Sequence, residues 1–236
     1  MKRQLRPGTT AYIAAISVAA TVVAIVLIRW PLPAMALPAF LMITVLGAAA
    51  HAFPLQGFRH QAYQVTLPFI VLAAATFNGA ELVTFIVAIH LAEQLRLRRK
   101  LYIQWFNTCD YLLSAALAMT FYHHAILLLP AGAVGQLSAA LAAACSFIVA
   151  NRALLALILW LARGLSPLAS GLFQPELLAA DLVIAWIAAP MLVVSIMAGP
   201  WTVLVTAGPL LLARPALCTI LDRQHADGQR VQIPAA

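Results

Sequence analysis

The stretch AYIAAISVAATVVAIVLIRW, residues 11–30, decides the fold class of this chain. It has no charged residue before Arg29, and its 20 residues are about the length that a helix needs to cross the hydrocarbon core of a bilayer. Similar apolar runs follow one another as far as residue 213. The sequence therefore predicts an all-α, polytopic membrane bundle.

The composition agrees with this prediction. Hydrophobic residues make up 64% of the 236 residues, charged residues only 9%, and the mean hydropathy is +0.96. Soluble domains carry about 25% charged residues, so a soluble globular protein is excluded. The formal charge of +7 does not indicate nucleic-acid binding, because the cations lie beside the apolar runs and not in a basic stripe with aromatic residues.

Eight apolar segments are expected, six of them convincing spans. They cover residues 11–30, 35–53, 63–77, 80–95, 105–129, 136–161, 175–198 and 201–213. The segments Tyr63 to Phe77 and Ala80 to Leu95 are short, so they are either tilted spans or a re-entrant hairpin. The predicted organisation is a basic N-terminus (1–10), a transmembrane bundle (11–214) and a polar tail (215–236).

Lys and Arg residues lie on alternate connectors between the apolar segments, and this pattern indicates how the chain is oriented in the membrane. The residues concerned are Lys2, Arg3, Arg6, Arg59, Arg96, Arg98, Arg99, Lys100, Arg163 and Arg214. Positively charged connectors stay on the cytoplasmic side of membrane proteins. Both termini are therefore expected in the cytoplasm.

Polar residues at membrane depth are the candidate functional residues, because such groups are costly there. Asn78 and Glu81 have the spacing of a capping box at the start of a helix, and capping is favoured over ligand binding. Asn107 and Asp110 are three residues apart, so they share a helix face. A ligand-binding face of these four residues is the alternative interpretation.

Arg152 lies next to Asn151, deep in a predicted helix. A lone arginine at that depth requires a carboxylate, and Asp110 and Asp181 lie in the same half of the bilayer. We expect Arg152 to pair with one of them. Such a pair stabilises the bundle interior, and it is at least as good an explanation as a ligand site.

Histidines and cysteines give no recognisable metal motif. His90 and Glu93 share a helix face, but His51 stands alone in the sequence, and no HExxH pattern occurs. The three cysteines are scattered, without CxxC spacing. No GxSxG, Walker A or GxGxxG motif is present either. The expectation is a protein without catalytic residues, metal ligands or cofactors.

Several short stretches resemble the membrane-embedded N-terminal region of bacterial GGDEF and HD-GYP proteins, whose cytoplasmic domains make or break cyclic di-GMP. The matching stretches are His51-Ala-Phe-Pro54, Tyr63-Gln-Val-Thr-Leu-Pro68, Trp105-Phe106-Asn107 and Gly208-Pro-Leu-Leu-Leu-Ala-Arg214. The resemblance implies a sensory input module in a bacterial inner membrane. No GGDEF-like or HD-type motif follows Leu217, so the module is expected to act through a cytoplasmic signalling partner.

The layout is also similar to substrate-binding subunits of energy-coupling-factor transporters, which lean on a coupling protein through small residues of the first helix. Ala15 and Ala19 would form that surface here. This alternative implies an ATPase partner. A non-catalytic membrane scaffold is the third interpretation. Lipid contact is expected in all three, with a homodimer as a further option and no nucleic acid.

Overall fold

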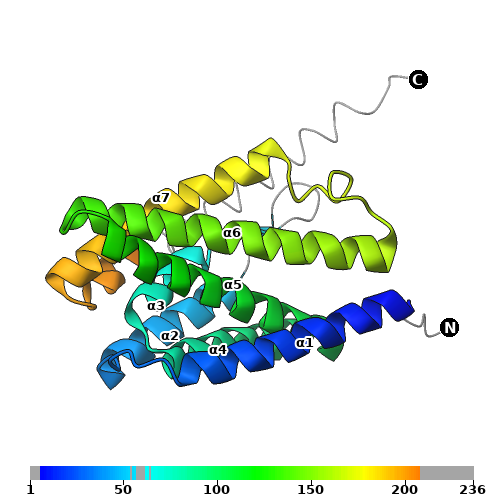
Figure 1. The fold of residues 1–236 in the computed structure, drawn as a ribbon, viewed down its shortest axis with the longest axis horizontal. Helices are drawn as coiled ribbons and strands as arrows, with labels where there is room; N and C mark the ends of the chain where they lie inside the picture. Colours follow the sequence, from blue (N-terminus) through cyan, green and yellow to red (C-terminus); the bar gives the residue numbers. More distant parts are fainter. Residues whose placement is uncertain (1–5, 54, 57–61, 64, 208–236) are drawn as a thin grey trace.

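The computed structural model describes residues 6–53, 55–56, 62–63 and 65–207, and these form a helical bundle (Figure 1). The labelled helices are α1 (Pro7–Ile28), α2 (Leu37–Ala52), α3 (Leu67–Thr76), α4 (Gly79–Leu97), α5 (Leu101–Leu128), α6 (Ala133–Arg163) and α7 (Pro175–Ala198). A further helical segment covers residues 202–207. The predicted tail, and the stretch from Gly208 to Arg214, lie outside the described residues.

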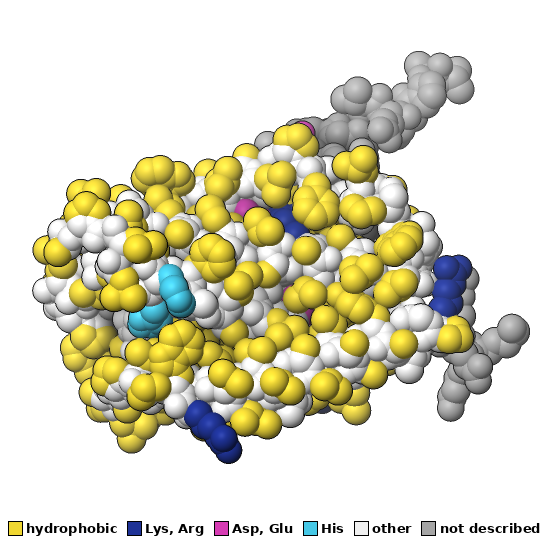
Figure 2. Space-filling model, in the orientation of Figure 1, with side chains coloured by type: hydrophobic (Ala, Val, Ile, Leu, Met, Phe, Trp, Pro, Cys, Tyr) yellow, Lys and Arg dark blue, Asp and Glu magenta, His cyan; other side chains and the backbone are white. Residues whose placement is uncertain are grey.

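Four helices, α1, α5, α6 and α7, are long and apolar enough to cross a membrane. Their outer faces carry large aliphatic and aromatic side chains, and hydrophobic atoms dominate the visible surface in Figure 2. On α1, Val18, Val22 and Val26 each expose more than half of their side-chain area (64%, 54% and 59%). Such surfaces suit contact with lipid and not with water. The coarse prediction of a helical membrane bundle is thereby supported, while the number of spans stays a prediction.

The segment predicted as a helix over residues 63–77 is different in the structure. Residues 62–63 form a short strand, β2 (Ala62–Tyr63), which pairs antiparallel with β1 (Leu55–Gln56), so Leu55 faces Tyr63. The helix α3 begins only at Leu67, with Pro68 in its first turn, where a missing N–H costs nothing. The helix predicted from Tyr63 therefore begins four residues later, at Leu67, and the all-α class holds for the bundle.

Helix α3 is a buried core helix. Its 10 residues extend about 15 Å at 1.5 Å per residue, half of what a bilayer core requires. Leu67, Ile70 and Leu72 are fully buried, and α3 packs against α5 and α7. An apolar helix that is buried all round belongs to the interior of a bundle. α3 alone is therefore too short to be a span.

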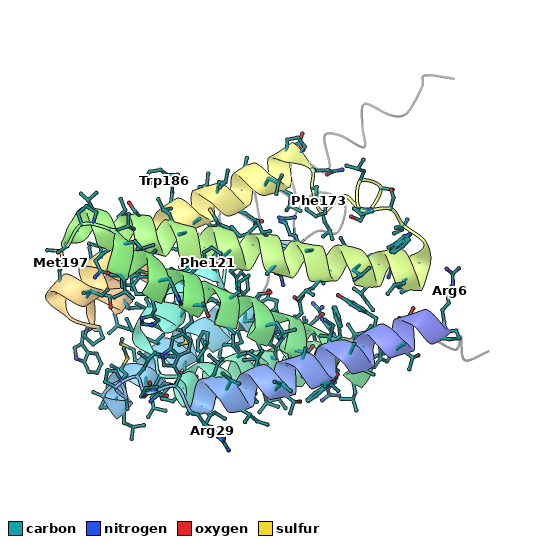
Figure 3. All side chains as sticks on the ribbon, viewed as in Figure 1. Arg6, Arg29, Phe121, Phe173, Trp186 and Met197 are labelled. Atoms are coloured by element: carbon teal, nitrogen blue, oxygen red, sulfur yellow. The ribbon has the colours of Figure 1, made fainter. Side chains whose placement is uncertain are left out.

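The basic connectors among the described residues lie toward one end of the bundle. The side chain of Arg6, at the start of α1, lies near Gly164, which ends α6. The Trp105 indole N–H, just after the connector between α4 and α5, donates to Ser17 of α1. Figure 3 shows Arg6 and Phe173 at this end, while Arg29 and Met197 lie toward the other. We call it the Arg6 end. Its assignment to the cytoplasm remains a prediction.

The ends of α4 show how local sequence sets the helix bounds. Asn78 caps the first turn, and Arg98 ends the helix in the left-handed region (φ 46°), which turns the chain into α5. Helix α7 covers the predicted residues 175–198, because Pro175 starts it and Gly199 follows it.

Gly79 offers a test of the packing between α1 and α4. A Cβ atom added there would lie 1.8 Å from the carbonyl oxygen of Leu27, so the two helix ends would have to separate. We expect Gly79→Ala to lower the free energy of unfolding by about 1–3 kcal/mol, the usual cost of overpacking. Thermal unfolding of the full chain in detergent measures this.

The matched control is Gly8→Ala, also in the first turn of a helix. A Cβ there would meet only Leu161 Cδ2, at 3.9 Å, which is an ordinary contact. This variant should unfold at or above the wild-type temperature. Equal melting temperatures for the two variants would contradict the close approach of α1 and α4.

Candidate functional site

Most of the polar side chains buried in this apolar bundle fall into two groups. The first, which we call the histidine–glutamate cluster, consists of His51, Thr66, His90, Glu93 and Gln104. Each of these side chains is buried, with at most 8% of its residue's surface exposed. The second, the Arg152 network, consists of Asp110, Ser114, Asn151, Arg152 and Asp181. A buried polar group is expensive unless it has partners, so each group requires an explanation.

Three helices supply four residues of the histidine–glutamate cluster, and the fifth, Thr66, directly precedes α3. His51 is the second-last residue of α2, and Gln104 lies in the first turns of α5. His90 and Glu93 are three residues apart near the end of α4, which places both on one face. The tight turn at Arg98 folds α5 back along α4. Gln104 thereby reaches the face that carries His90 and Glu93.

The centre of the cluster is a triangle of three nitrogen and oxygen atoms. His51 Nε2 lies 3.3 Å from His90 Nδ1 and 3.4 Å from Glu93 Oε2. The third side, from His90 Nδ1 to Glu93 Oε2, measures 3.5 Å. Among the described residues, His51, His90 and Glu93 form the one group of three His, Cys, Asp or Glu side chains whose possible metal-binding atoms all lie within 4.8 Å of one another.

Surrounding groups hold this triangle in place. Thr66 Oγ1 lies 3.1 Å from His51 Nδ1, so it orients that ring. The Gln104 side-chain amide donates to Glu93 Oε2 at 3.0 Å and to the backbone carbonyl of His90 at 2.8 Å. The Tyr111 ring packs edge-on against both histidines, with centroid distances of 5.2 Å and 4.7 Å.

Glu93 connects the cluster to the basic connector. Its Oε1 accepts from Arg99 Nη2 at 2.9 Å, while its Oε2 faces the two histidines. The Glu93 side chain is only 6% exposed, whereas that of Arg99 is 37% exposed. The arrangement can therefore stabilise a buried carboxylate and present it to a proton or a cation.

A groove of about 450 Å³ lies between α4 and α5, beside the cluster. His90 and Gln104 contribute to its lining, together with Val87, Leu91, Trp105 and Thr108. Two members of the buried cluster thus border a cavity that is open to the outside of the bundle.

Asn78 and Glu81 form a cap at the opposite end of α4. The Glu81 N–H donates to Asn78 Oδ1, and the Asn78 N–H donates to Glu81 Oε2, both at 2.9 Å. Glu81 Oε1 also accepts from the Met35 N–H at 2.9 Å. These contacts confirm the capping interpretation, and the bond to Met35 connects the start of α4 to the segment that precedes α2.

Asn107 and Asp110 lie beside the middle of α4. Because Gln104 contacts residues 90 and 93, they are displaced from Asn78 by roughly 12–16 Å along the axis, at 1.5 Å per residue. The four residues of the suggested ligand face therefore form no single contact group. Asn78 and Glu81 cap the start of α4, next to the end of α1. Asn107 and Asp110 lie on α5, farther toward the Arg6 end.

In the Arg152 network, two neighbours on α6 each bind a different carboxylate. Arg152 Nε donates to Asp181 Oδ2 on α7 at 2.8 Å, and its other nitrogens reach Asp181 and the Leu172 carbonyl. Asn151 Nδ2 donates to Asp110 Oδ2 on α5 at 3.0 Å. Adjacent side chains of one helix therefore connect it to both of its neighbours.

The histidine–glutamate cluster was missed in the sequence because His51 lies 39 residues from His90. The sequence signal that could have identified the cluster is the depth at which each residue lies in its predicted membrane span. His51 ends one predicted span, His90 and Glu93 lie near the end of another, and both ends face the same predicted side of the membrane. Cys109 is buried, Cys145 is exposed, and Cys218 lies outside the described residues.

Asp181→Asn tests the Arg152 network. The substitution keeps the shape of the side chain but removes the charge that compensates the buried guanidinium. Breaking a buried pair on one side costs about 3–5 kcal/mol, so we expect a loss of that order in the free energy of unfolding. Denaturation of the full chain in mixed micelles, followed by circular dichroism, measures it.

Glu176→Gln is the control, because Glu176 is an exposed carboxylate on the same helix. It should change the free energy of unfolding by less than about 0.5 kcal/mol. If Asp181→Asn were as stable as this control, Arg152 would not depend on Asp181.

No protein-family model matches the chain, and no curated protein or solved structure matches it either. The function of the chain is therefore argued from its own residues and contacts, with the short stretches that resemble the signalling proteins.

Proposed function

We propose that this chain is a non-catalytic membrane sensory module that acts on cyclic di-GMP-type signalling through a cytoplasmic partner. The observation that carries the proposal is the continuous contact path from His51, through Glu93, to Arg99. It links a buried cluster to the basic connector between α4 and α5. The predicted orientation places this connector on the cytoplasmic side, where a signalling partner would meet it.

The path offers a way to transmit a change. Glu93 has one oxygen toward the histidines and the other toward Arg99. Protonation of the cluster, or binding of a cation, changes the charge that Arg99 sees. Because ion pairs at low dielectric are strong, such a change alters the balance between two positions of the connector. A stimulus then shifts a population of states by its differential affinity for them.

Neighbouring contacts make the connector sensitive to the cluster. The Gln94 side chain donates to the Arg99 carbonyl at 2.9 Å, and the Arg96 guanidinium donates to the Ala52 carbonyl at the end of α2. The connector is therefore held by the same two helices that carry His51 and Glu93. Movement of either helix end changes these bonds.

The resemblance supports the signalling assignment. Two of its stretches contribute His51 and Thr66, and a third begins at Trp105, directly after Gln104. Segments that are far apart in the sequence thus meet in one cluster. A shared function of these segments is consistent with three of the four similar stretches lying at or beside the cluster, while the fourth lies outside the described residues.

One observation favours the transporter-subunit alternative. Ala11, Ala15 and Ala19 are exposed along one face of α1, so another membrane helix could approach closely there. In that case the chain would bind a small metabolite, and a separate ATPase would supply energy. Co-purification with an ATPase from native membranes would favour this alternative over the sensory one.

Glu93→Gln tests the sensory proposal in the native host. The substitution preserves the size of the side chain but removes the charge that links the histidines to Arg99. We expect the cellular cyclic di-GMP concentration to move from the wild-type value toward that of a strain lacking the chain. Mass spectrometry of nucleotide extracts measures it, at equal protein abundance in the membrane.

His124→Ala is the control, because His124 is exposed at the far end of α5. Strains carrying it should match wild type. If deletion of the whole chain left the cyclic di-GMP concentration unchanged, the link to this second messenger would be refuted.

A further inference from the structure

We propose that His51 Nε2, His90 Nδ1 and Glu93 Oε2 bind one divalent transition-metal ion, for which zinc is the best fit. The inference concerns metal binding itself and holds whether or not the chain takes part in signalling. It rests on the geometry of the three atoms, the chemistry of the donors and the groups that hold the donors in place.

The distances are those of a coordination sphere. Zinc lies about 2.0–2.2 Å from nitrogen and oxygen ligands, so tetrahedral ligand atoms are about 3.3–3.6 Å apart. The three sides of the triangle measure 3.3, 3.4 and 3.5 Å. An ion at bonding distance from all three atoms therefore requires no movement of the helices.

The donor set selects the class of metal. Two imidazole nitrogens and one carboxylate oxygen suit zinc and its first-row neighbours. Calcium and magnesium bind mainly oxygen ligands, so they are disfavoured. Three protein ligands leave a fourth position for water, and Gln104 Oε1, which is buried without a hydrogen-bond partner among the described residues, could accept a hydrogen bond from that water.

The surrounding groups act as supports for ligands. Thr66 Oγ1 contacts His51 Nδ1, which leaves the opposite nitrogen free for a metal. The Gln104 amide and Arg99 hold the two oxygens of Glu93. Partners of this kind orient metal ligands in known sites and strengthen metal binding about 10–100-fold.

Hydrogen bonds also connect the atoms of the cluster. His51 Nε2 lies 3.3 Å from His90 Nδ1 and 3.4 Å from Glu93 Oε2, and the Gln104 amide nitrogen lies 3.2 Å from His90 Nδ1. A metal ion bound to His90 Nδ1 would replace the contact of this nitrogen with Gln104. The Gln104 amide would keep its hydrogen bonds to Glu93 Oε2 and to the His90 carbonyl.

The groove between α4 and α5 provides access. A metal site needs an entry path, and the lining of this cavity of about 450 Å³ includes His90, one of the three ligands. The groove therefore reaches to one of the three ligands from the outside of the bundle.

The test uses the full, tag-free chain in detergent, stripped with EDTA, loaded with zinc and freed of excess metal. Elemental analysis should give about one zinc ion per chain, the value for a single three-ligand site. His90→Ala and Glu93→Gln should reduce this to the background of a protein-free sample. Cobalt loading should give the visible absorption of a tetrahedral site in wild type and not in these two variants.

Two measurements separate loss of metal binding from loss of folding. Circular dichroism and gel filtration identify variants that do not fold, and Glu93→Gln preserves the size of the side chain. The double variant of His123 and His124 to alanine removes two adjacent histidines outside the cluster, and it should bind zinc as wild type does.

Wild-type protein that stays at background zinc would overturn the proposal, as would variants that bind as much zinc as wild type. Equal loss in the His123 and His124 control would assign the zinc to adventitious sites. None of these outcomes depends on cyclic di-GMP, so the metal site and the signalling role succeed or fail separately.

Discussion

The cost of placing a charged side chain in an apolar interior governs how this bundle is built. An ionised group there requires a partner of opposite charge and full hydrogen bonding. The structure meets this requirement twice, at Arg152 with Asp181 and at Glu93 with Arg99 and the histidines. Because each set draws on different helices, pairing of charges also determines which helices lie together. The apolar surfaces give the bundle its cohesion, and these contacts specify its arrangement.

The two polar groups differ in what surrounds them. Arg152 and Asp181 satisfy one another within the bundle and require no further component. Glu93 and its histidines bring two ring nitrogens and one carboxylate oxygen close together, and they lie next to a groove and a charged connector. Its position beside the groove and the connector, and not its burial alone, makes this cluster the candidate functional site.

Much of the fold is accessible from the sequence because helix ends are encoded locally. Pro175 and Gly199 define α7, and Asn78 with Glu81 defines the start of α4. The helical class follows from the length of the apolar runs. The start of α3 was not predictable in this way, because Tyr63 pairs with Leu55, eight residues earlier in the chain, and that pairing is not encoded at the helix end. The cluster was hidden for the same reason: His51, His90 and Gln104 become neighbours only when α2, α4 and α5 have packed. The pairing of Arg152 was easier to predict, because Asp110 and Asp181 were the only carboxylates expected at its depth.

The burial of α3 has a consequence for how the chain is made. A segment of 10 residues is too short for stable insertion as an independent span, and its partners include α7, which begins at Pro175. The ribosome must therefore synthesise about a hundred further residues before α3 has its complete set of neighbours. Until then, its apolar surface depends on lipid or on the insertion machinery. Biogenesis of this protein thus includes a late assembly step, in which the last helices close over a segment that was translated much earlier.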